Sequence, residues 1–314
     1  MKILFVCDIH GSNIIFNKLL STVSENNIDV LIISGDLSGK DIRPIIENDN
    51  EFTVEFNGEL HIYSNEEICE FEKMNSGLGH YFFYTTKEIL EKFKKTPTEI
   101  LEILDRKILE RIETWIQQII KQIDLKTTSI VISPGNDDIF EINTLIENYR
   151  DKGIYSGLIN PIEIGEFRII TLDYSNPTPW QTERELNEKQ LEILINSKVR
   201  EIKSFKKTIF NFHCPPYKTK LDIAPEIDKN LRFVVNPGGI NKTHIGSKAV
   251  LNSILKYQPV LSLHGHVHES PGFDYIGNTL ALNPGSEYEK GILNAYIIEL
   301  ENDGNINNYY LIEK

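Results

Sequence analysis

The chain has 314 residues, of which 40% are hydrophobic and 25% are charged, as in ordinary globular proteins and unlike disordered chains. Its 33 basic and 46 acidic residues give a formal charge of −13, which argues against a surface that binds nucleic acid by neutralising many phosphates. Three cysteines without a CxxC pair argue against a disulfide framework, and there is no signal-peptide core or long apolar run, so we expect a cytoplasmic protein that is neither exported nor anchored in a membrane.

Short apolar runs that end at turn residues recur along the chain and predict strands buried on both faces. They lie at residues 3–6, 30–33, 130–132, 169–172, 208–212, 260–263 and 279–282. Helical spacing of apolar residues lies between several of them, at 12–24, 139–149, 184–198 and 248–257. Two late strands, 292–300 and 307–312, are expected to form a hairpin. This order predicts α/β layers.

Residues 38–126 interrupt this order. Segments 52–56 and 60–63 flank Asn57-Gly58, which is a strong hairpin signal, and segments 85–94 and 98–122 have helical spacing. The apolar stripe of 98–122 is more typical of core packing than of a partner-binding face. We interpret 38–126 as an inserted, cap-like subdomain of a hairpin plus helices, within a main domain formed by residues 1–37 and 127–314.

Polar side chains follow five of the predicted strands. In open α/β sheets, ligands bind outside the carboxyl ends of the strands. Carboxylates and imidazoles together suit divalent Mn, Fe, Zn or Co. Each fragment alone is typical of a turn or a helix cap, but their joint occurrence at strand ends predicts a metal site. The fragments are Asp8-Ile9-His10, Gly35-Asp36, Gly135-Asn136-Asp137-Asp138, His213 and His264-Gly265-His266-Val267-His268.

In this order, the fragments resemble the motifs of the calcineurin-like metallophosphoesterases, and more narrowly of their Icc-related branch of predicted phosphoesterases. The resemblance covers both ends of the chain and skips the insert. It implies an α/β (α+β) fold, a four-layer β-sandwich flanked by helices, with two divalent ions at the strand ends. The implied ligands are Asp8, His10, Asp36 and His268 for one ion, and Asp36, Asn136, His213 and His266 for the other, with Asp36 bridging.

Two such ions hold a bridging hydroxide and clamp phosphate oxygens, so the resemblance implies a hydrolase that attacks a small-molecule phosphoester in line. Asp36 and Asp137 are the candidate catalytic residues, and Asn136 is also a candidate substrate-binding residue. The family usually has histidine where this chain has Asp137. An ionised aspartate there would repel phosphate rather than protonate the leaving group. We therefore expect a preference for phosphodiesters or other esters with good leaving groups.

Two other functions remain open. Loss of the histidine is one way in which a catalytically weak or inactive metal-binding scaffold of the same fold could begin, although a scaffold has no need of the full ligand set. A nuclease is disfavoured by the acidic balance.

Four further features have two interpretations each. The loops at 177–180 with Arg184, and at 215–217 with Lys218, form either an aromatic or cationic pocket wall or solvated turns. His264 either supports a ligand or is a histidine satisfied at a strand end. Residues 283–286 either lie near the metals or form a simple turn.

Overall fold

A computed structural model describes residues 1–93 and 95–314. Its main body contains two six-stranded sheets, each with four parallel strands in it. The first has the order β20-β19-β1-β2-β7-β8 and the second the order β17-β18-β16-β11-β10-β9. The first sheet comprises β1 (Lys2–Cys7), β2 (Val30–Ser34), β7 (Ser129–Ser133), β8 (Ile154–Tyr155), β19 (Asn294–Leu300) and β20 (Ile306–Glu313). The second comprises β9 (Ile162–Ile164), β10 (Phe167–Leu172), β11 (Thr208–Phe212), β16 (Leu261–Leu263), β17 (Gly272–Ile276) and β18 (Thr279–Asn283).

The two sheets pack face to face because alternate residues of each buried strand point to opposite sides. In β1, Ile3 and Phe5 join the core between the sheets, where they meet Ile209 of β11. Leu4 and Val6 face the other way, into the core beneath the helices of the first sheet. This alternation explains why the central strands are apolar throughout.

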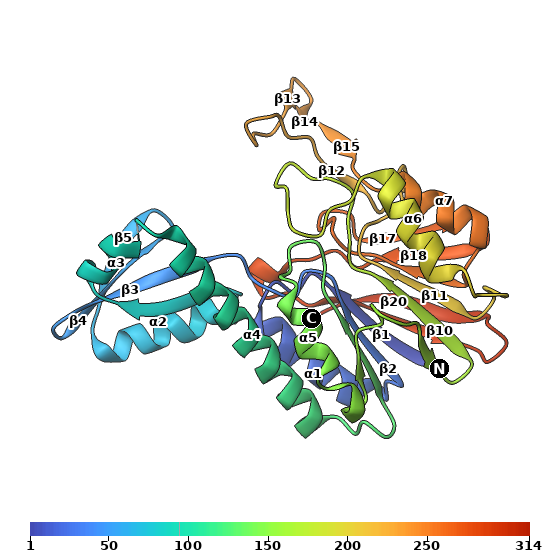
Figure 1. Cartoon of the computed structure of the whole chain (residues 1–314), viewed down its shortest axis with the longest axis horizontal. Coiled ribbons are helices and arrows are strands. Elements are labelled where there is room, and N and C mark those ends of the chain that lie inside the picture. The colour runs from blue at the N-terminus through green and yellow to red at the C-terminus, as the bar shows by residue number, and fades with distance from the viewer. Residues whose placement is uncertain (94) are drawn as a thin grey trace.

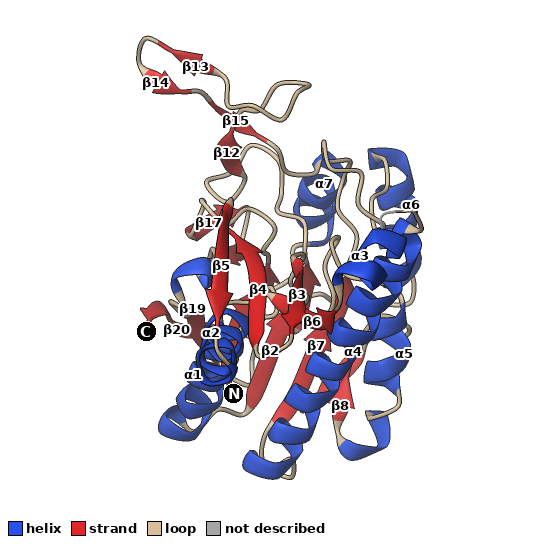
Figure 2. Cartoon of the chain, turned by 90° about the vertical axis from the view of Figure 1, so that its left-hand side faces the viewer, coloured by secondary structure: helices blue, strands red, loops and turns tan. Residues whose placement is uncertain are grey.

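Helices cover the outer face of each sheet, so the main body is a four-layer sandwich (Figures 1 and 2). The helices α1 (Asn13–Asn26) and α5 (Glu141–Glu147) cover the first sheet, and α6 (Glu188–Val199) and α7 (Lys248–Tyr257) cover the second. Ser12 and Ser247 cap α1 and α7 by accepting the amide hydrogens of Ile15 and Val250. The predicted fold class is confirmed.

A separate lobe stands beside the main body in Figure 1. It contains a four-stranded sheet of order β5-β4-β3-β6, formed by β3 (Ile42–Asn48), β4 (Glu51–Phe56), β5 (Glu59–Tyr63) and β6 (Tyr81–Thr85). The hairpin predicted at Asn57-Gly58 is confirmed, with Phe56 paired to Glu59. The lobe also contains α2 (Asn65–Gly77) and α3 (Lys87–Phe93); Lys94, the last residue of the predicted helix 85–94, lies outside the described residues.

The helix α4 (Pro97–Gln122) runs from the lobe to the main body (Figure 2). Its buried residues Ile108, Ile112 and Ile116 pack in the same core as α1 and the first sheet. Arg111 of this helix donates to the carbonyl of Gly11 at 2.8 Å and to that of His80 at 2.9 Å. The helix therefore fastens the lobe to the loop that follows β1.

A long hairpin, residues 223–244, projects from the second sheet and is called the arm below (Figure 1). Its base pairs β12 (Ile223–Pro225) with β15 (Lys242–His244), and its tip pairs β13 (Val235–Asn236) with β14 (Gly239–Ile240). Two short 3₁₀ turns, η1 (Arg150–Lys152) and η2 (Tyr288–Lys290), complete the elements of the described residues. Within these residues, no helix is long and apolar enough to cross a membrane.

Candidate metal centre

The loops that follow β1, β2, β7, β11 and β16 meet at one edge of the sandwich, where the parallel strands of both sheets end. One ligand atom from each side chain of Asp8, His10, Asp36 and His268 lies within 4.8 Å of the others. The same holds for Asp36, His213 and His266. The structure thus brings together the carboxylates and histidines that the motifs single out, from strands far apart in sequence.

Asn136 joins the second of these groups. Its Oδ1 lies 2.9 Å from Nε2 of His213, and its Nδ2 donates to Oγ1 of Thr182 at 2.9 Å. The Thr182 hydroxyl in turn donates to Glu185 at 2.8 Å. This chain of hydrogen bonds holds the amide with its oxygen toward the cluster.

Asp36 lies between the two groups. Its Oδ2 is 3.8 Å from Nε2 of His10, and its Oδ1 is 3.5 Å from Nε2 of His213. Oδ1 also accepts the backbone N–H of Asp137 at 3.0 Å. One carboxylate therefore presents an oxygen to each histidine group, as a bridging ligand must.

Four of the candidate ligands lie in the left-handed backbone region, which non-glycine residues rarely adopt. The φ angles are 53° at Asp8, 41° at His10, 30° at Asp36 and 68° at His266. Such conformations cost about 1–3 kcal/mol each and persist where the surroundings impose them. Here the loops are tied together, since the amide of His10 donates to Asp36 O at 3.0 Å and that of His266 donates to Asp8 Oδ2 at 2.9 Å.

Burial sets the protonation of the cluster in the absence of ions. It lowers the pKa of His266 and His268 to about 4 and holds the pKa of His10 well below its usual value, so these imidazoles are neutral at pH 7. Burial also raises the pKa of Asp8 to about 7, and burial with neighbouring carboxylates raises that of Asp36. Divalent cations bind neutral imidazoles and ionised carboxylates, so binding would release the protons that Asp8 and Asp36 retain.

The residues fit such ions. Oδ1 of Asp8 and Nδ1 of His213 are buried and have no hydrogen-bond partner among the described residues. Buried polar atoms without partners are uncommon in folded proteins and call for an explanation such as an ion. Nε2 of His10 and Nε2 of His268 also converge to 3.1 Å. Mixed oxygen and imidazole donors suit borderline divalent metals.

Asp137 and Asp138 have different surroundings. Asp138 is fully buried and accepts the amide hydrogens of Leu37 and Ser38, each at 2.8 Å, and of Gly135 at 2.9 Å. It therefore locks the loop after β2 to the loop after β7. Asp137 instead forms an ion pair with Lys40, which the sequence motifs did not single out.

Several neighbours hold these loops in place. Arg184, one of the possible pocket-wall residues, is fully buried, pairs with Asp173 and donates to Asp138 O at 2.8 Å. It precedes α6, which begins at Glu188, so the predicted start of that helix at 184 was too early. His264 lies 2.7 Å from Oγ of Ser262 and is a satisfied histidine.

The predicted loop at 283–286 reaches the centre through one contact. The hydroxyl of Ser286 donates to the carbonyl of Asp8 at 2.6 Å. Nδ1 of His264 plays a similar part beside His213, since it lies 2.9 Å from Phe212 O and 3.0 Å from Cys214 O. Both segments therefore support the backbone of a candidate ligand.

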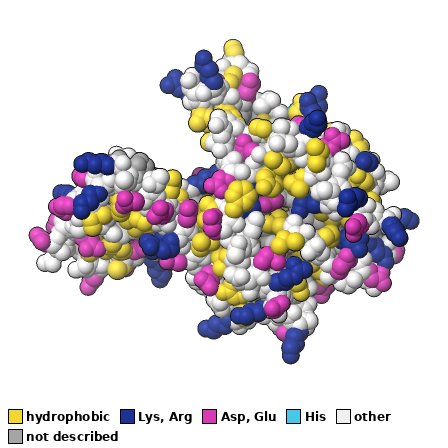
Figure 3. Space-filling model, in the orientation of Figure 1, with side chains coloured by type: hydrophobic (Ala, Val, Ile, Leu, Met, Phe, Trp, Pro, Cys, Tyr) yellow, Lys and Arg dark blue, Asp and Glu magenta, His cyan; other side chains and the backbone are white. Residues whose placement is uncertain are grey.

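A cavity of about 680 Å³ opens over the cluster. Asp36, Asn136, Asp137, His266, His268 and Lys40 line it on one side. Trp180 and Tyr217, both in loops proposed from the sequence, line its wall, together with Phe233 of the arm. Trp180 is 62% exposed and Phe233 59% exposed, and Figure 3 shows further hydrophobic side chains toward the tip of the arm. The cavity thus combines a polar floor with an aromatic wall.

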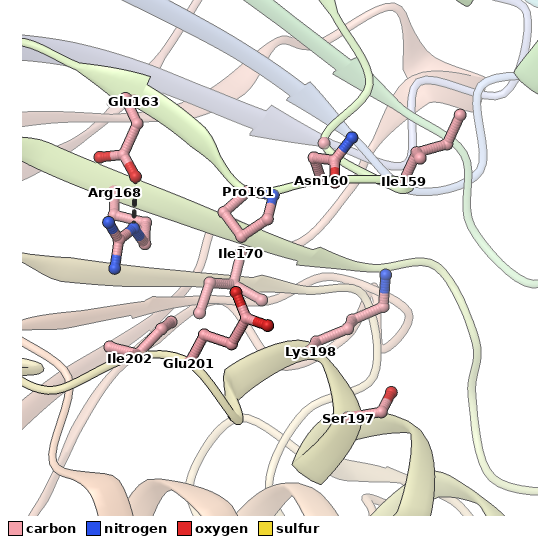
Figure 4. A pocket seen from close by; sticks show the side chains of 11 residues that line it. Ile159, Asn160, Pro161, Glu163, Arg168, Ile170, Ser197, Lys198, Glu201 and Ile202 are labelled. Carbon is pink, nitrogen blue, oxygen red and sulfur yellow. Dashed lines mark hydrogen bonds and ion pairs between the residues drawn. The ribbon is translucent and has the colours of Figure 1, made fainter.

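A second cavity, of about 420 Å³, lies at the other end of the second sheet, between β9, β10 and α6 (Figure 4). Three of its charged groups have partners: Arg168 pairs with Glu163, and Lys198 donates to Leu158 O at 2.7 Å. Within the described part of the chain, no group of metal-type ligands lies there.

Comparisons with known proteins show the fold but no assigned activity. No family model matches the chain. An uncharacterized protein of Methanocaldococcus jannaschii is 27% identical over 160 residues, which are 49% of this chain and 63% of that protein. The match therefore spans less than two thirds of the relative's length.

Solved structures resemble the whole chain. One matches with a TM-score of 0.59 at 18% identity and covers 99% of this chain and 98% of its own. TT1561 of Thermus thermophilus matches with a TM-score of 0.52 at 12% identity and covers 99% of this chain and 97% of its own. A dimetal phosphatase from Danio rerio matches with a TM-score of 0.45 at 8% identity and covers 100% of this chain and 98% of its own. The first two show that the overall fold occurs in other proteins.

Proposed function

We propose that this chain, which has the calcineurin-like metallophosphoesterase fold, is a dinuclear metal-dependent phosphoesterase. The observation that carries the proposal is the position of Asp36. Its two carboxylate oxygens face two separate groups of buried or half-buried ligands, each with at least one neutral histidine. A single structural ion would need only one such group.

The ligand sets follow from these two groups. Asp8, His10, Asp36 and His268 would hold one ion, and Asp36, Asn136, His213 and His266 the other. When bound, two divalent ions supply a hydroxide nucleophile at neutral pH and neutralise charge on the phosphate oxygens. The donor set suits Mn, Fe, Zn or Co. The chain itself orients the ligands, through the Thr182 hydroxyl on Asn136 and the Ser286 hydroxyl on the backbone of Asp8.

The cavity supports an organic phosphoester of small size as the substrate. Trp180, Tyr217 and Phe233 offer apolar, partly exposed rings on the wall above the ligands. Asp137 stands at the position where a proton donor for the leaving group is expected and already pairs with Lys40. An ionised carboxylate donates no proton, so we propose that the enzyme favours phosphodiesters and other esters whose leaving group needs little help.

The experiment measures metal content and hydrolysis in the same preparation. We expect close to two transition-metal ions per chain and Mn-stimulated hydrolysis of bis(p-nitrophenyl) phosphate that a chelator abolishes. Asp36→Asn should lose most of the bound metal and reduce kcat/KM at least about a hundredfold, because the shared ligand charge is gone. The exposed Asp151→Asn is the matched control.

Two outcomes would count against the proposal. Two bound ions without turnover of aryl diesters, alkyl monoesters or nucleoside phosphodiesters would favour the metal-binding scaffold. Failure to retain any divalent ion would contradict the centre itself.

A further inference from the structure

We propose that Lys40 contacts the phosphate group of the substrate through its ammonium, and that Asp137 is a positioning residue that holds this ammonium beside the ligand cluster. The inference rests on the proposed function and deepens it, because it names the group that takes the place of the missing histidine. It starts from the ion pair between Nζ of Lys40 and Oδ2 of Asp137.

The two partners of this ion pair differ in exposure. The Asp137 side chain is only 8% exposed, whereas that of Lys40 is 59% exposed. Both line the cavity above the candidate metal ligands. An ammonium has three N–H donors, and one carboxylate oxygen does not use them all. Lys40 therefore presents donors to the cavity from the side on which Asp137 holds it.

The backbone on both sides of the pair is fixed. Lys40 follows a loop whose amides at Leu37 and Ser38 donate to Asp138, and the amide of Gly11 donates to Leu37 O at 2.7 Å. Asp137 is held by its amide on Asp36 and by the Asn136 side-chain amide, which donates to its Oδ1 at 3.2 Å. Both residues are thus anchored to loops that carry candidate ligands, so the ammonium is placed before substrate arrives.

Electrostatics make the pair more than a surface salt bridge. The ion pair lines the same cavity as Asp36, His266 and His268. A lone Asp137 carboxylate would repel a phosphate anion, whereas the pair is neutral and directs its cationic end to the cavity.

Two roles for Lys40 must be separated: neutralising Asp137, and touching phosphate. The variants are Lys40→Met, Asp137→Asn and the double variant, with Lys40→Arg as the conservative change. Lys107→Met is the matched control, because Lys107 pairs with Glu110 on the surface of α4. Metal content and thermal unfolding are measured for each, so that loss of the centre or of the fold is recognised.

The first measurement is the affinity of the Mn-loaded proteins for inorganic phosphate, which needs no turnover. We expect Lys40→Met to weaken phosphate binding about tenfold to a hundredfold, as for the loss of one charge-assisted hydrogen bond. The double variant should recover part of this loss but stay several-fold weaker than wild type. Asp137→Asn should also weaken phosphate binding, but less than Lys40→Met does, because the ammonium remains and is no longer held beside the cluster. Lys40→Arg should keep part of the affinity because it keeps the positive charge, and Lys107→Met should match wild type.

The second measurement is kcat and KM for bis(p-nitrophenyl) phosphate. We expect Lys40→Met to raise KM and lower kcat, because the ammonium contacts the phosphate before and during the reaction. Wild-type phosphate affinity in the double variant or in Lys40→Met would overturn the inference, since Lys40 would then only neutralise Asp137. So would a Mn-loaded wild type that does not bind phosphate.

Different results would contradict the Lys40 contact and the phosphoesterase activity. Ordinary ester hydrolysis with phosphate affinity unchanged in the Lys40 variants overturns the Lys40 contact alone. Lysine-dependent phosphate binding without hydrolysis of any ester class supports the contact and overturns the phosphoesterase.

Discussion

At the scale of single residues, the centre depends on backbone conformations that its ligands would not adopt by themselves. Asp8, His10, Asp36 and His266 all have positive φ angles. Glycines beside them provide the room: an added Cβ at Gly35 would lie 2.1 Å from Nδ1 of His213. The candidate ligands therefore come together because their loops pack against one another, and not because of the conformational preference of any single residue.

Gly135 provides a direct test of this packing. A Cβ there would lie 2.4 Å from Oδ1 of Asp36 and 2.7 Å from Nε2 of His213, closer than any real contact. We expect Gly135→Ala to lower the free energy of unfolding by about 1–3 kcal/mol and to weaken metal binding at least tenfold, since the two ligands must move apart. The measurements are chemical denaturation and Mn titration.

The control for this prediction is Gly238→Ala in the arm, where the nearest atom is a side-chain oxygen of Asn236 at 3.3 Å. Metal affinity equal to wild type in Gly135→Ala would show that the loops relax around the added carbon.

The second prediction at the scale of single residues concerns Asp137. Asp137→His should raise kcat for an alkyl phosphate monoester relative to bis(p-nitrophenyl) phosphate, because an imidazolium can protonate an alkoxide and a carboxylate cannot. We expect about a tenfold or greater change in the ratio of the two rates. Asp137→Asn, which removes the charge without adding an acid, is the control. Equal alkyl-ester turnover in wild type and Asp137→His would contradict the proposed leaving-group preference.

The sequence was sufficient to name the candidate ligands but not their neighbours. Asp8-x-His10 and His266-x-His268 are recognisable because paired polar residues directly follow strand-like apolar runs. Their backbone is not extended, since Asp8, His10 and His266 have positive φ angles. Lys40 belongs to no motif, and a single lysine in a loop is usually solvated. Arg184 looked like a helical or pocket-wall residue and is instead buried beneath Asp138. Only the folded chain shows which charges meet.

At the scale of elements, α4 connects the lobe to the core of the main body. Its stripe of apolar residues packs in a core, as the spacing predicted, and the structure shows that this core belongs to the main body. Trp115 stacks on Phe16 of α1 with 4.8 Å between ring centroids. The indole N–H of Trp115 also donates to Asn13 at 2.7 Å. The helix thus packs as part of the main body although its sequence lies within the predicted insert.

This packing gives a prediction about stability. Ile116 is fully buried in α4, so Ile116→Ala should lower the free energy of unfolding by about 2–5 kcal/mol through lost burial and a cavity. Leu101→Ala, near the start of the same helix and 56% exposed, should change it by no more than about 0.5 kcal/mol. Denaturant unfolding followed by circular dichroism measures both. Equal effects of the two changes would contradict the assigned core.

Most elements with strong local signals were predicted, whereas several weakly apolar elements and the aromatic strand β6 were missed. The central strands and the Asn57-Gly58 hairpin were found because apolar runs and turn residues bound them. The helix α2 was missed because Ile68 and Phe71 are its only buried large apolar residues. The edge strand β17 alternates exposed Phe273 and Tyr275 with polar residues, and the arm contains several turns, so neither shows a buried-strand pattern.

At the scale of the whole molecule, three parts meet around the cavity. The main body provides the candidate ligands, the loop that leads to the lobe provides Lys40, and the arm provides Phe233. Trp180 and Tyr217 complete the wall from loops of the second sheet. Cavity residues that are not candidate metal ligands are therefore expected to set the size of the substrate.

Shortening the arm tests whether the arm contributes to substrate binding and not to metal binding. Replacing residues 227–240 by Asn-Gly should leave a two-residue hairpin between Glu226 and Asn241, whose backbones already pair, with Glu226 N donating to Asn241 O at 2.8 Å. We expect metal content and phosphate affinity to stay as in wild type, while KM for an aryl phosphodiester rises about three- to tenfold. An unchanged KM would show that the arm takes no part in binding this substrate, and loss of metal would show that it supports the centre.

Arg111 joins the carbonyl of Gly11, one residue after His10, to the carbonyl of His80 in the lobe. The contact has a kinetic consequence. Any displacement of His80 would therefore reach the loop that carries His10 through one side chain. In the proposed centre, the ion at His10 is then expected to exchange with solution at a different rate from the other ion, even where their equilibrium affinities are alike.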